Sequence, residues 1–77
     1  MNVADQIVER LSTYLGPNTA RVAVQTFARK SLGKAPEQVT AADAPALLEA
    51  LRPMLRTLVG ADSTDALLRS LREEVLG

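Results

Sequence analysis

The sequence contains no cysteine and no histidine. Without cysteine the chain can form neither a disulfide nor a thiolate metal site, and we expect a reducing compartment. Without histidine it lacks the commonest general base and the commonest zinc ligand. The only aromatic residues are Tyr14 and Phe27, which leaves little for stacking on nucleic-acid bases.

The chain also lacks an excess of charge of either sign, since nine Lys and Arg residues balance nine Asp and Glu residues. This balance gives no overall field that attracts nucleic acid or an anionic membrane, and it permits self-association. No apolar run approaches the roughly 20 residues that span a bilayer. Residues 1–5 lack the basic and apolar regions of a signal peptide. We therefore expect a soluble cytoplasmic protein, or a domain excised from one, in which nothing spans a membrane.

What the chain does contain is helical periodicity. The longest strongly apolar run is 46–60, and its larger apolar residues recur at the spacing of one helix face. These residues are Leu47, Leu51, Met54, Leu55 and Leu58. The other segments can pack against this stripe. The pattern predicts one all-α domain over residues 1–77, a compact four-helix bundle with this helix at its centre.

Cap and breaker residues predict the helix boundaries. We expect helices over 2–15, 20–32 and 43–59, and a fourth that begins at Asp62 or Ser63 and reaches the C-terminal residues. Asn2 is the expected cap of the first helix, and Asn18 or Thr19 that of the second. The Gly33–Thr40 segment is the main loop, with one short helical turn after Pro36 and Val39 pointing inward. Thr40 to Asp43 fits a capping box in which Asp replaces Glu, and Asp43 is itself a possible cap.

Pro53 lies inside the predicted central helix. Proline removes the hydrogen bond to the carbonyl of Glu49 and clashes with that turn. Two interpretations stay open: a kinked helix over 43–59, or a break at Arg52 with a short helix from Pro53. The apolar spacing continues through Pro53, which favours the kink.

The segment from Gly60 to Asp65 resembles the Asp-Ser-Leu region of acyl carrier proteins, where the serine at the start of an acidic helix carries phosphopantetheine. The resemblance implies a truncated carrier-like domain modified on Ser63. The chain departs from that pattern at Thr64, which replaces an apolar residue, and at Arg69 and Arg72, which interrupt the acidic face. A helix N-cap accounts for the same residues, and we predict no cofactor.

A second segment, Tyr14 to Pro17 followed by Ala20 to Val22, is similar to part of small helical domains appended to bacterial signalling proteins, including serine/threonine kinases. This resemblance implies a non-catalytic accessory module. It carries no functional residues.

A cluster of basic residues without an acid lies between Ala20 and Pro36: Arg21, Arg29, Lys30 and Lys34. Such a patch could contact phosphates, which gives the alternative of a small nucleic-acid-binding domain. The remaining helices are neutral or acidic, so the sequence favours a solvated face or the docking of an acidic protein.

Catalysis has little support. Serines, lysines and carboxylates show no clustering that would form a nucleophile–base pair, and no glycine-rich phosphate loop is present. We predict no catalytic, cofactor or metal site, and a protein that is not an enzyme.

The functional prediction rests on apolar residues that fall outside the buried stripes. The predicted partner-binding residues are these, together with nearby cations: Arg21, Val22, Arg29, Lys30, Leu48, Val59 and Leu76. We therefore predict a protein–protein interaction or oligomerisation module. Its partner would be another protein or a second copy, and the second and fourth helices would face it.

Overall fold

The computed structural model describes residues 2–76, and of Leu76 only the backbone. Four α-helices account for most of it: α1 (Val3–Leu15), α2 (Pro17–Phe27), α3 (Ala44–Val59) and α4 (Ala61–Leu76). A π-helical turn, η1 (Ala28–Leu32), extends α2, and a 3-10 turn, η2 (Pro36–Gln38), lies in the long connection. No strand occurs among residues 2–76, so the predicted all-α class with four helices is confirmed.

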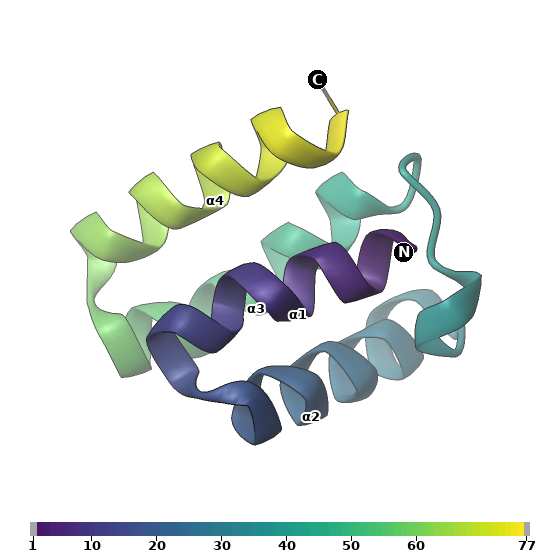
Figure 1. Ribbon diagram of the computed structural model, residues 1–77, viewed down its shortest axis with the longest axis horizontal. Helices are drawn as coiled ribbons and strands as arrows, with labels where there is room; N and C mark the ends of the chain where they lie inside the picture. The colour runs from purple at the N-terminus through teal and green to yellow at the C-terminus, as the bar shows by residue number, and fades with distance from the viewer. Residues whose placement is uncertain (1, 77) are drawn as a thin grey trace.

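The chain reverses direction at two single-residue corners (Figure 1). Gly16 joins α1 to α2 and Gly60 joins α3 to α4, with φ of 86° and 89°. These values lie in the region that favours glycine. The predicted cap of the second helix at Asn18 or Thr19 is wrong, because Pro17 is already the first residue of α2. Proline is well suited there, since the first helical residue needs no N–H donor. The last helix likewise begins earlier than predicted, at Ala61.

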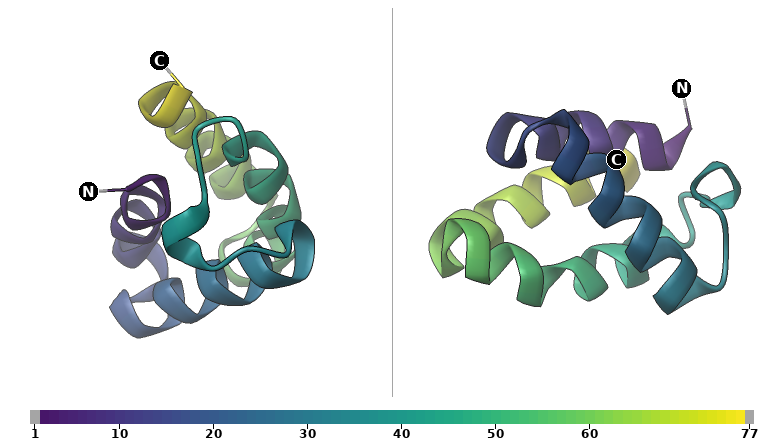
Figure 2. Two further views of the ribbon diagram at one scale, coloured as in Figure 1. Left: turned by 90° about the vertical axis from the view of Figure 1, so that its right-hand side faces the viewer. Right: turned by 90° about the horizontal axis from the view of Figure 1, so that it is seen from below.

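The main loop is confirmed between Gly33 and the start of α3. Figure 2 shows this connection crossing the end of the bundle opposite the glycine corners. Val39 is buried as predicted, and η2 packs on α1. Asp43 makes no side-chain cap for α3; its carboxylate instead accepts hydrogen bonds from the backbone N–H of Thr40 (3.1 Å) and from the Nζ of Lys34 (2.6 Å). This is one half of the expected capping box.

Helix α3 contacts α1, α2, η1 and α4, and with five buried residues it contributes more to the described core than any other helix. It runs through Pro53 without interruption, so the alternative of a break at Arg52 is wrong. The core is aliphatic. Its largest fully buried side chains are Ile7, Leu11, Val24, Leu47, Leu48, Leu51, Leu55 and Leu71.

Leu58, placed on the buried stripe of the central helix, proves exposed, and so does Tyr14. Leu58 is 53% exposed and Tyr14 is 51% exposed, and each belongs to the last turn of its helix. The stripe of a helix continues to its end, whereas the neighbouring helices that cover it stop at the corners. No helix among residues 2–76 has the length and apolar character needed to cross a membrane.

Candidate functional site

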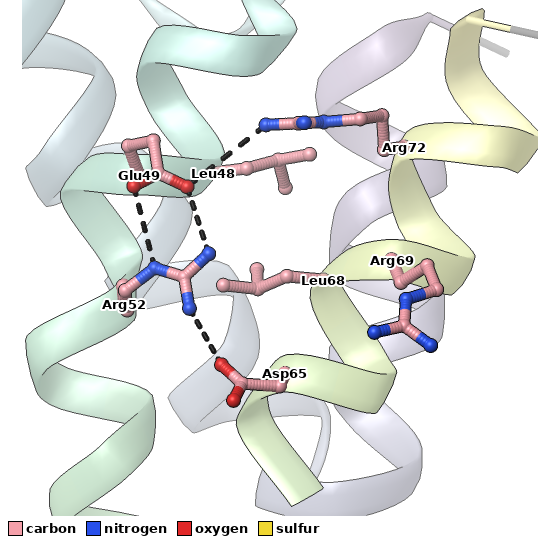
Figure 3. A pocket seen from close by; sticks show the side chains of 7 residues that line it. All are labelled: Leu48, Glu49, Arg52, Asp65, Leu68, Arg69 and Arg72. Carbon is pink, nitrogen blue, oxygen red and sulfur yellow. Dashed lines mark hydrogen bonds and ion pairs between the residues drawn. The ribbon is translucent and has the colours of Figure 1, made fainter. Parts of the chain in front are cut away.

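A charged cleft of about 230 Å³ lies between α3 and α4 (Figure 3). Leu48 and Leu68 contribute apolar atoms to it, and the remaining lining residues are charged: Glu49, Arg52, Asp65, Arg69 and Arg72. The charged side chains come from both helices, so the cleft is a product of the α3–α4 packing.

Four of the five charged residues that line this cleft form ion pairs with one another. The Arg52 guanidinium binds the Glu49 carboxylate at 2.9 Å and the Asp65 carboxylate at 2.6 Å, which joins α3 to α4. Arg72 approaches Glu49 from α4 at 3.9 Å. The hydrogen bonds from Arg52 hold the pKa of Glu49 below its ordinary value, with smaller help from the charge of Arg72. Asp65 thus forms its ion pair with Arg52 of α3 and not with Arg69, four residues further along α4. Because the carboxylates of Glu49 and Asp65 already bind guanidinium groups, we interpret these ion pairs as a structural link between α3 and α4.

A second link joins α1 to α4. The Arg10 guanidinium donates to the hydroxyl of Ser70 and forms an ion pair with Glu74 at 3.2 Å. Within residues 2–76 no group of three acidic side chains lies close enough together to hold a metal ion. The Asp65 and Glu74 carboxylates of α4 thus link that helix to α3 and α1.

An apolar groove of about 420 Å³ lies on a different part of the surface, between α2 and α3. Its lining residues carry no charge and are mostly apolar or small: Asn18, Thr19, Val22, Ala23, Thr26, Phe27 and Met54. All but Met54 come from α2, and Met54 reaches the groove from the middle of α3. Val22 is 60% exposed, the largest exposed fraction among the large apolar side chains of residues 2–75.

Helical spacing explains why this groove stays open on one side. Asn18, Val22 and Thr26 follow one another at intervals of four residues, and all three are exposed. Ala23 and Phe27 each follow an exposed stripe residue by one position, so they point towards the core. Met54 packs against the core from the other side of the groove. The floor is therefore apolar and anchored in the core, while the α2 side is exposed.

The predicted partner-binding residues are only partly brought together. Val22 lines the groove, whereas Leu48 is 1% exposed, so its prediction as a surface residue is wrong. Leu48 is buried because α3 is covered on two sides. Helix α2 and η1 pack on one side and α4 on the other, so a larger part of the circumference of α3 is buried. Val59 is half-buried against the core. The prediction for Leu76 lies outside the described side chains.

The predicted basic patch is divided. Lys34 forms an ion pair with Asp43, and Arg21 lines a separate hollow together with Asp5 and Glu37. Arg29 and Lys30 are exposed on η1 and form no salt bridge with any residue of the described part of the chain. The four cations therefore do not act as one surface, which weakens the nucleic-acid alternative.

Phe27, Met54 and Thr26 were missed as surface-site residues, because the periodic pattern assigns the first two to buried stripes. The spacing of Asn18, Val22 and Thr26 could have marked the exposed stripe of α2. The contribution of Met54 depends on the crossing of α3 and has no local signal.

No family model, curated protein or solved structure matches the chain. Its function must therefore be inferred from its own side chains and their arrangement.

Proposed function

We propose that this chain is a non-catalytic protein–protein interaction module, and that the groove between α2 and α3 is its docking surface. The observation that carries the proposal is the groove itself, in which exposed Val22 faces a floor continuous with the hydrophobic core. Apolar surface of this kind gains free energy when another chain covers it. The cytoplasmic location and a place in bacterial signalling stay predictions.

Site-specific photo-cross-linking tests the proposal. A photoreactive residue is placed at Val22 or Thr26, both exposed groove positions, in cells that express the chain naturally. The matched control position is Arg56, which is exposed on α3 and does not line the groove. We expect discrete adducts from the two groove positions and none from position 56.

The mass of the adduct distinguishes the two kinds of partner. Twice the mass of the chain identifies a second copy, and any other discrete mass identifies another protein. Adducts absent from both groove positions, or identical at all three positions, would contradict the proposal.

A further inference from the structure

The surroundings of the groove are basic. Lys30 follows Val22 and Thr26 at the same four-residue interval, and Arg29 lies seven residues after Val22, so both cations continue the exposed stripe of α2. No acidic residue occurs from Arg10 to Pro36, and none lines the groove. The groove thus runs from Asn18 to Phe27 along α2, and the two exposed cations lie just beyond its Phe27 end, on η1.

This distribution disfavours a second copy as the occupant. A two-fold contact between parallel α2 helices would place Arg29 and Lys30 against the same two residues of the other copy. An antiparallel contact would place them at the N-terminus of the other α2, which carries a partial positive charge. Neither arrangement supplies an acid, so like charges oppose each other across the contact.

The shape of the groove defines the complementary partner. Positions 18 to 26 span about 12 Å along a helix axis, roughly two helical turns. A trough between two helices accepts the apolar ridge of a third, formed by residues three and four apart. Acidic side chains on that third helix would find Arg29 and Lys30 within reach at one end.

Resting on the proposed function, we propose that the occupant is an amphipathic helix of another protein. Two turns of its apolar ridge lie between Val22 and Met54, and acidic residues at one end of that ridge pair with Arg29 and Lys30. The apolar contact supplies the affinity, and the charges set the direction in which the helix lies.

Two model peptides test this assignment on the full chain labelled with ¹⁵N. Both are helical, about 16 residues long, and share one leucine ridge; their flanking residues are Glu in one and Lys in the other. We expect the Glu peptide to shift the amide resonances of residues 18–30 and those around Met54. It should bind roughly tenfold more tightly than the Lys peptide at low ionic strength.

Charge reversal provides the matched variants. The double substitution Arg29→Glu and Lys30→Glu should reverse the preference between the peptides, whereas Arg56→Glu should leave it unchanged. All three sites are exposed, and circular dichroism verifies that the variants stay folded. The preference of the unmodified chain should also fall as salt is added.

The remaining outcomes overturn the assignment in distinguishable ways. Equal binding of both peptides removes the acidic partner and leaves the groove as a docking surface. Shifts confined to the α3–α4 cleft place the peptide elsewhere. A chain that doubles its mass with concentration, and loses this on Val22→Glu, identifies a second copy as the occupant. If neither peptide binds while position 22 still gives adducts, the helical occupant is wrong and the proposed function stands.

Discussion

At the scale of single residues, the least favourable feature of the core is Thr64. Its side chain is fully buried in α4, and its hydroxyl has no hydrogen-bond partner. A buried hydroxyl without a partner loses its hydration without compensation. Thr64 is also one of the residues at which the chain departs from the carrier-protein pattern, and its burial indicates a packing role.

Replacing Thr64 with Val should therefore stabilise the protein. Valine has a similar shape and helix propensity and brings no polar atom into the core. We expect the free energy of unfolding to rise by about 1 kcal/mol, measured by urea denaturation. Thr13→Val, at an exposed position of α1, is the control and should change it by less than about 0.5 kcal/mol. A loss of stability in Thr64→Val would show that the hydroxyl has a partner in solution.

At the scale of helices, α3 combines the central position in the bundle with an internal proline. Pro53 cannot donate to the carbonyl of Glu49, yet the helix continues to Val59. The contacts of α3 with its neighbours outweigh the local cost, which is why the apolar spacing was a better guide than the proline. Thr57 lies one turn after Pro53, and its hydroxyl donates a hydrogen bond of 3.1 Å to the Pro53 carbonyl.

Pro53→Ala should stabilise the protein, because it restores the missing backbone hydrogen bond. We expect a gain of about 1–3 kcal/mol in the free energy of unfolding, after allowance for the greater flexibility of the unfolded chain. Pro45→Ala is a matched control within the same helix. Pro45 lies in the first turn, where proline costs little, so that change should be neutral or slightly destabilising. Equal effects at both positions would contradict this account.

The sequence was a good guide to elements and a poorer guide to how widely each is buried. Asn2 accepts a hydrogen bond from the backbone N–H of Asp5 at 2.8 Å, so its predicted capping role is confirmed. Leu48 was wrongly placed on the surface and Leu58 in the core, because a single helix does not reveal how many neighbours cover it. The π-helical turn η1 was not predicted, because the sequence over 28–32 has no signal for it as clear as a cap residue is for a helix start.

The candidate site was less predictable than the fold for the same reason. The exposed position of Val22 follows from periodicity alone, but the groove also needs Met54 of α3, which lies 32 residues after Val22 in the chain. The separation of Lys34 from Arg29 and Lys30 was equally hidden, since it depends on the ion pair with Asp43.

At the scale of the whole molecule, acid should weaken the fold through two carboxylates. The hydrogen bond from Lys34 lowers the pKa of Asp43 below its ordinary 3.8, and the hydrogen bond from Arg52 lowers the pKa of Glu49 below its ordinary 4.5. In the unfolded chain both groups regain their ordinary values, so the unfolded state binds protons at a higher pH than the folded state. Their stabilisation is complete above about pH 5 and is lost as the pH falls through 4.5 and below.

Thermal denaturation between pH 7 and pH 2 measures this effect. We expect the melting temperature to be flat near neutrality and to decrease below pH 4.5. The double variant Asp43→Asn and Glu49→Gln should start lower at pH 7 and show a shallower decrease. Added salt should reduce the difference at pH 7, because both ion pairs are partly exposed. An unchanged slope in the variant would assign the acid sensitivity to other groups.

The two glycine corners leave the connection over 33–43 as the one long link between the two halves of the protein. Each half is a helical hairpin closed by a single residue, and the halves meet across a shared aliphatic interior. A backbone cut within this connection would therefore leave both hairpins whole. We expect their shared aliphatic interior to hold the two fragments together without a covalent bond.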